Sequence, residues 1–164
     1  MATTTTIPTV KQRLVVVGAA AFDDAGYLGG DVPVTYTWPG PDTQEECAFL
    51  GPHPDTADIR LDGTSQIPTI KAGRKQRQEE YTVRFTIWEF RPDLTVVAAA
   101  TCEAQAFALL GLLEDELAND VRIGLPATTV QDIQIDAVAS TLFPFNAGWA
   151  CEIAVDLAVR ARLT

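Results

Sequence analysis

Apolar and polar residues alternate along three segments of the chain, a pattern typical of strands that bury one face. The segments are residues 32–38, 81–87 and 151–163. A period of two residues places the apolar side chains on one side of a sheet. Pro33 cannot donate to a sheet ladder, which indicates that the first strand lies at an edge or begins there.

Two segments instead repeat their apolar positions with helical spacing. The first begins at Ile7-Pro8, where proline suits a first helical turn, and it ends at the glycines of residues 26–30. The second covers 96–118 and has a continuous leucine-rich face. The sequence therefore predicts a short N-terminal helix and a longer central helix.

Two further stretches, 45–50 and 130–142, have strand-like composition. The resulting order is a helix, two or three strands, a strong strand, the long helix and two strands. This order predicts an α+β fold in which both helices cover one face of an antiparallel or mixed sheet. With 164 residues and no linker, the chain is expected to be one domain, 1–164, with residues 1–6 as a flexible tail.

Charge is distributed unevenly along the chain. The net charge is −10, which argues against a protein that wraps nucleic acid. Residues 71–91 nevertheless carry six basic and three acidic side chains, net +3, whereas the rest carries six basic and nineteen acidic, net −13. A basic projection that meets an acidic surface on an identical subunit would give head-to-tail contacts, which close into rings or run on as filaments. The alternative is that the basic segment forms the tip of a hairpin in contact with solvent alone.

Residue chemistry gives little support to catalysis or metal binding. Cys47, Cys102 and Cys151 are scattered, which predicts reduced and largely buried thiols. The single histidine, His53, lies between two prolines and lacks an evident partner. Acidic pairs such as Glu45-Glu46 are more typical of a solvated surface than of a site. No cofactor or metal is expected, and no uninterrupted apolar run reaches the roughly 20 residues that span a membrane.

One aromatic side chain is a candidate contact. Trp88 lies on the face of its strand opposite to Tyr81, Val83 and Phe85. A large aromatic residue on a wet face is typical of an interface. The alternative is packing at the edge of the core.

The order of several motifs resembles the tail-terminator (tail-completion) proteins of long-tailed bacteriophages with non-contractile tails. The run Ile-Pro-Thr-Ile-Lys-Ala-Gly-Arg-Lys at 67–75 leads into Glu-Glu-Tyr-Thr-Val at 79–83. The helix ending at 110–117, the pair Gly148-Trp149 and the strand ending at 159–163 follow. The resemblance covers residues 5–164.

This resemblance implies a structural virion protein without enzymatic activity. Its members form a ring, here expected to have six subunits, at the head-proximal end of the tail tube. The ring ends tube polymerisation and contacts the head–tail connector, and genomic DNA passes through the lumen without specific binding. The expected partners are other copies, the major tail tube protein and the connector or stopper. The protein is expected in the neck of the virion after synthesis in the host cytoplasm, with no membrane association.

The candidate contacts with a neighbouring subunit or the tube are mainly basic. They are Lys71, Arg74, Lys75, Arg77, Trp88, Arg160 and Arg162. Three alternatives remain open. The protein could be the adaptor or stopper on the head side of the joint, or a DNA-contacting neck protein that uses the basic segment. It could also be a small α+β ligand-binding or enzymatic domain.

Overall fold

The computed structural model describes all residues except 1–4, 41–45, 53–63, 68–76 and 164. Two helices and six strands make up this part of the chain. In chain order they are α1 (Ile7–Ala21), β1 (Val34–Thr35), β2 (Glu46–Leu50), β3 (Thr64–Ile67), β4 (Arg77–Arg91), α2 (Val96–Asn119), β5 (Val130–Phe145) and β6 (Gly148–Leu163).

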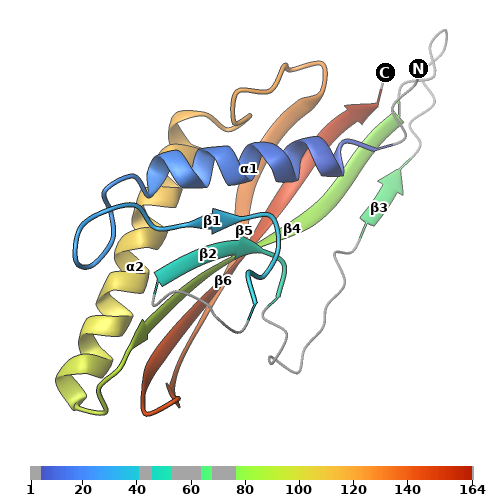
Figure 1. Cartoon of the computed structure of the whole chain (residues 1–164). Coiled ribbons are helices and arrows are strands. Elements are labelled where there is room, and N and C mark those ends of the chain that lie inside the picture. The colour runs from blue at the N-terminus through green and yellow to red at the C-terminus, as the bar shows by residue number, and fades with distance from the viewer. Residues whose placement is uncertain (1–4, 41–45, 53–63, 68–76, 164) are drawn as a thin grey trace, which may run out of the picture.

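The six strands form one mixed sheet. Its main path has the order β1-β2-β4-β6-β5, and β3 pairs with the start of β4. β1 runs parallel to β2, and every other neighbouring pair is antiparallel. The three longest strands, β4, β5 and β6, lie side by side and extend across the whole molecule (Figure 1).

Both helices pack on the same face of this sheet, as the sequence predicts (Figure 1). The apolar positions of α2, including Cys102, Leu109 and Leu113, lie against alternate residues of β4 and β6 such as Phe85 and Val155. These side chains are fully buried. Burial of this kind stabilises a fold by about 25 cal/mol per Å² of apolar surface, so the long strands and α2 carry most of the core. The predicted α+β class is confirmed.

The central strands are longer than the alternation indicates. β4 begins at Arg77 and β6 begins at Gly148, so each adds residues before its predicted start. A two-residue hairpin joins β5 to β6, and both turn residues, Asn146 and Ala147, have positive φ. Positive φ at both positions matches the twist of the flanking strands. An alanine in this position carries no sequence signal for a turn, which explains the missed boundary.

Two expectations about the N-terminal part are wrong. The alternation over 32–38 predicts seven residues of strand, but only Val34 and Thr35 pair with β2. The tail expected at residues 1–6 does not include the last two of them. Thr5 and Thr6 are held by hydrogen bonds to the carboxylate of Glu79, and Thr6 is buried.

Candidate functional site

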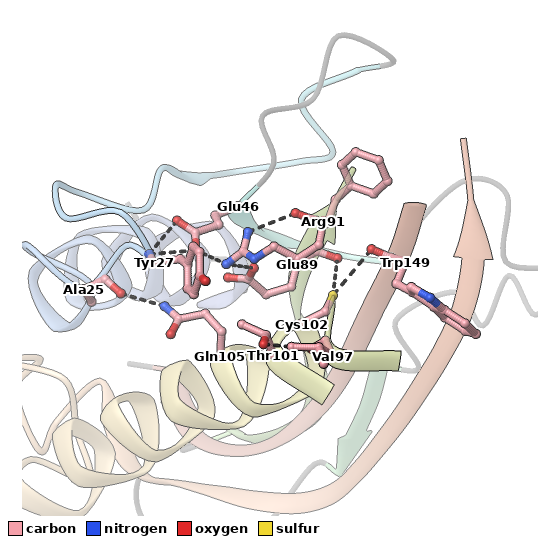
Figure 2. A network of polar contacts seen from close by, with 11 residues as sticks. Ala25, Tyr27, Glu46, Glu89, Arg91, Val97, Thr101, Cys102, Gln105 and Trp149 are labelled. Carbon is pink, nitrogen blue, oxygen red and sulfur yellow. Dashed lines mark hydrogen bonds and ion pairs between the residues drawn. The ribbon is translucent and has the colours of Figure 1, made fainter. Parts of the chain in front are cut away.

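A buried charged network fixes one end of the sheet to the loop after α1 (Figure 2). The Arg91 guanidinium lies 2.9 Å from Glu46 and 3.1 Å from Glu89, and its Cζ lies 3.9 Å from the centre of the Tyr27 ring. Glu46 also accepts a hydrogen bond of 2.8 Å from the backbone N–H of Tyr27. Two carboxylates therefore compensate one buried cation, and the same contacts hold the loop against β2 and β4.

The thiol of Cys102 lies beside this network but is chemically quiet. Its one S–H proton is shared between the backbone oxygens of Glu89 and Trp149, which lie 3.4 and 3.5 Å from Sγ (Figure 2). Burial, together with the Glu89 carboxylate, raises the pKa of Cys102 to about 11. A thiol with a raised pKa is a poor nucleophile at neutral pH. All three cysteines are free and buried, which confirms the prediction of reduced, buried thiols.

Three described carboxylates near the loop after α1 are engaged by the chain itself. Glu46 belongs to the network above, while Asp24 accepts from the backbone N–H of Gly30. The backbone N–H of Asp24 in turn donates to Asp31. In the part of the chain that the structure describes, no three His, Cys, Asp or Glu residues come together as a possible metal site. His53 lies outside the described residues.

The second face of the sheet bears a small aromatic core at one end. Trp88 lies on this face, as predicted, but only 3% of its surface is exposed, so the expectation of a wet aromatic side chain is wrong. It packs with Cys47, Phe49 and Ala150. Phe143 and Phe145 contact the Trp88 ring edge-on, with centroids 5.9 and 5.3 Å away. Period-two alternation identifies the face of a residue but not what covers that face.

The other end of this second face is charged. Arg84 makes a two-pronged ion pair with Asp156 at 2.8 and 2.9 Å. Further along, exposed Arg160 lies 3.8 Å from Glu80 and 3.9 Å from Asp132. Arg160 and Arg162 share this face and are both exposed, so they are available for contacts. Positions 71, 74 and 75 of the predicted basic contact lie outside the described residues, and Arg77 begins β4.

The outward side of α2 is apolar, although an outward helix face is usually polar. Val96, Val97, Phe107 and Leu112 are exposed over 84, 75, 43 and 40% of their surfaces. Ala100, Ala104 and Ala108 fill the positions between them and are also exposed. We call these seven residues the α2 outer face. Glu103 is the one charged residue between positions 96 and 112.

By length and composition, α2 is the one helix among the described residues that is apolar enough to cross a membrane. A core helix of a globular domain passes the same test, and the inner side of α2 packs on the sheet. The sequence prediction missed the α2 outer face because the helix was interpreted from its leucine face alone. A helix apolar on all sides is the signal that identifies it.

β5 forms one edge of the sheet, beside β6. Its residues 136–141, Asp-Ala-Val-Ala-Ser-Thr, are all exposed. Native edge strands are usually kept from pairing with other chains by lysines, prolines or bulges. This stretch has no lysine or proline, and its one irregularity is the register shift at Asp136, so residues 137–141 are a regular edge without these devices. The edge of β5 is therefore a second surface suited to contact with another chain.

Comparison with known proteins establishes a fold relationship. No family model matches the sequence, and no curated protein matches it. Among solved structures, the chain is similar to a chain in the structure titled "Virion of native gene transfer agent (GTA) particle". The TM-score is 0.50 at 15% identity, and the alignment covers 94% of this chain and 90% of that chain. The two chains share their fold along nearly their whole lengths.

Proposed function

We propose that this protein is a structural subunit of a phage-like particle, in which copies assemble into a ring of six at the head-proximal end of the tail tube. The ring ends tube polymerisation and contacts the head connector, and DNA passes through its lumen. In this role the protein lies in the neck of the virion and has no enzymatic activity.

The observation that carries the proposal is the α2 outer face. Val96 and Val97 are largely exposed, and Phe107 lies about three turns further on the same side of the helix. Exposed contiguous apolar surface of this kind marks interfaces between proteins. A subunit of an assembly buries such a face against its neighbours, and the virion that contains a chain of similar fold is an assembly of this type.

The motif resemblance supplies the specific position in the particle. It favours the end of the tail tube over other places in a virion, and the acidic chain suits a lumen through which DNA slides. A lumen with net negative charge repels the phosphate backbone, so DNA is not retained.

The test uses the purified chain and isolated tail tubes. Mass in solution and negative-stain microscopy of the concentrated protein are expected to show sixfold rings, and added protein is expected to cap one end of each tube. A monomer that leaves tube ends bare would overturn the proposal. Rings that bind head connectors but leave tubes bare would instead assign the protein to the head-side adaptors.

The α2 outer face is tested by Ala104→Glu, which places a carboxylate in its centre. Glutamate is a good helix former, so the fold is expected to persist while rings and capping are lost. Ala118→Glu is the matched control, because Ala118 is exposed on the same helix beyond the apolar stretch. Normal ring formation by Ala104→Glu would remove the α2 outer face from the interface.

The basic segment gives a second test of head-to-tail contact. Reversing the charge of Arg74, Lys75 and Arg77 is expected to weaken the ring and leave the melting temperature of the monomer nearly unchanged. Exposed ion pairs contribute roughly 0–1 kcal/mol to the stability of a subunit. A large fall in melting temperature would mean that the segment packs within its own subunit.

A further inference from the structure

The exposed edge of β5 is straight and able to accept another strand. Beyond a register shift at Ile135/Ala137, residues 137–145 pair with β6 residue by residue without interruption. The start of β5 is already covered, because the backbone N–H of Ile133 donates to the carbonyl of Val121. The open and regular part of the edge is therefore the stretch at 137–141.

The opposite edge of the same sheet is β1, and it is incompletely used. Apolar and polar residues alternate from Val32 to Trp38, and the ladder with β2 comprises Val34 and Thr35, preceded by a bond from the Ala48 N–H to the carbonyl of Pro33. Residues 33–38 carry no charged side chain, and Asp136 is the one charge in 136–141. Two copies of this acidic chain thus meet with little repulsion at these two edges.

Strand directions permit antiparallel pairing between the two edges. β5, β6, β4 and β2 alternate in direction, and β1 runs parallel to β2. β1 therefore runs opposite to β5. In a ring whose axis runs along the strands, all copies point in the same direction along that axis. β5 of one copy and β1 of the next are then antiparallel neighbours, and antiparallel pairing is slightly more stable per residue than parallel pairing.

The register places the two edges at the same level along the strands. Val34 connects to Ser140 through the successive partners Ala48, Ile87 and Ile153. Thr35 connects to Ala139 through the successive partners Phe49, Thr86 and Ala154. Subunits of a closed ring are related by rotation without a rise along its axis. A ring thus places Thr35 of one copy level with Ala139 of the next.

We infer that β5 of one copy pairs with β1 of the next copy, so that the sheet continues from subunit to subunit. This inference rests on the proposed ring and specifies which surfaces of the fold form it. Pairing along 137–141 extends β1 beyond its two residues, within the segment where apolar and polar residues alternate.

The experiment is disulfide crosslinking with the double variant Thr35→Cys/Ala139→Cys in the full chain, with and without tail tubes. Directly opposed residues in antiparallel strands lie about 4.5–5.5 Å apart between Cα atoms, within disulfide range. The native cysteines are buried. A ladder of covalent oligomers up to six chains is expected on non-reducing gels. Val34→Cys/Ser140→Cys is a second pair at the same level, in case the first variant does not fold.

Two controls separate the possible arrangements. Thr9→Cys/Ala139→Cys keeps one cysteine and moves the other to the exposed side of α1, and it is expected to give no ladder. Ala139→Cys alone is also expected to stay uncrosslinked. A covalent dimer of Ala139→Cys would overturn the inference, because it would mean that β5 pairs with β5. Rings or capped tubes without a ladder from either pair would overturn it and leave the ring intact. Monomers that leave tubes bare would refute both the ring and this pairing.

Discussion

Glu79 holds the first turn of α1 on the sheet, and its removal is expected to loosen that turn. The residue has no exposed surface. One carboxylate oxygen accepts from the Thr5 hydroxyl at 2.5 Å. The other accepts from the Thr6 backbone N–H and the Thr6 hydroxyl, both at 2.8 Å. The Thr6 hydroxyl also lies 3.0 Å from the Tyr81 hydroxyl. These contacts join residues more than 70 positions apart in the sequence.

The magnitude follows from the three donors. A hydrogen bond to a charged group contributes about 1.5–3 kcal/mol, but donors near the start of the chain regain water when their acceptor is lost. We therefore expect Glu79→Ala to lower the free energy of unfolding by about 3 kcal/mol. For a chain of this length each kcal/mol corresponds to roughly 2–4 °C, so the melting temperature falls by about 6–12 °C.

Urea denaturation followed by circular dichroism, at fixed protein concentration, measures this change. Thr6→Ala alone is expected to cost about 1 kcal/mol. In the double variant the losses are not additive, because both changes remove the hydrogen bond from the Thr6 hydroxyl to Glu79, and a coupling of about 1 kcal/mol is expected. A loss below 1 kcal/mol for Glu79→Ala, or additive losses, would refute the view that this carboxylate anchors the helix.

Three further predictions concern buried groups. Gly148→Ala is expected to destabilise the fold by about 2 kcal/mol or more, measured by thermal melting, because a Cβ there would collide with the carbonyl oxygen of Arg91. An unchanged melting temperature would contradict this. Burial raises the pKa of Glu152 above its ordinary 4.5 although Arg84 opposes the shift, so the ionised carboxylate costs stability at pH 7. Glu152→Gln should therefore stabilise the protein at pH 7, with the gain vanishing below about pH 4.5, and a gain that persists at pH 3 would contradict the electrostatic cause. Burial raises the pKa of all three thiols, so iodoacetamide at pH 8 should modify only the unfolded protein. The pKa values are raised to about 12 for Cys47, about 11 for Cys102 and about 12 for Cys151. Rapid labelling of the native chain would contradict their burial.

The sequence predicts most of the framework because the framework follows from periodicity. Alternation over 81–87 and 151–163 identifies the two central strands, and the leucine spacing of 96–118 identifies α2 almost to the residue. These segments are long, and each buries one continuous face. The order of elements then limits the fold to helices on one side of a sheet.

What the sequence could not provide depends on contacts between distant residues. From the sequence, Glu79 is interpreted as a surface charge. The structure places Thr5 and Thr6 beside its carboxylate. From the sequence, Trp88 is interpreted as a solvent-exposed aromatic residue. In the structure Phe143 and Phe145, from the end of β5, pack against it. In each case one strand determines the face of a residue, and a second segment determines the residue's environment.

The three surfaces proposed for assembly, which are the α2 outer face and the edges of β5 and β1, lie on elements that the fold already holds in place. The Arg91 network fixes the loop after α1 beside the N-terminal half of α2, where Gln105 also donates to the carbonyl of Ala25 (Figure 2). From Ala137 onward the edge of β5 is held by uninterrupted pairing with β6, and β1 is held by the parallel ladder to β2. Association loses less conformational entropy when the contacting groups are ordered beforehand. In the proposed ring, the Arg91 network thus keeps the loop beside the α2 outer face in place, and strand pairing keeps the two sheet edges in place, before a neighbour arrives.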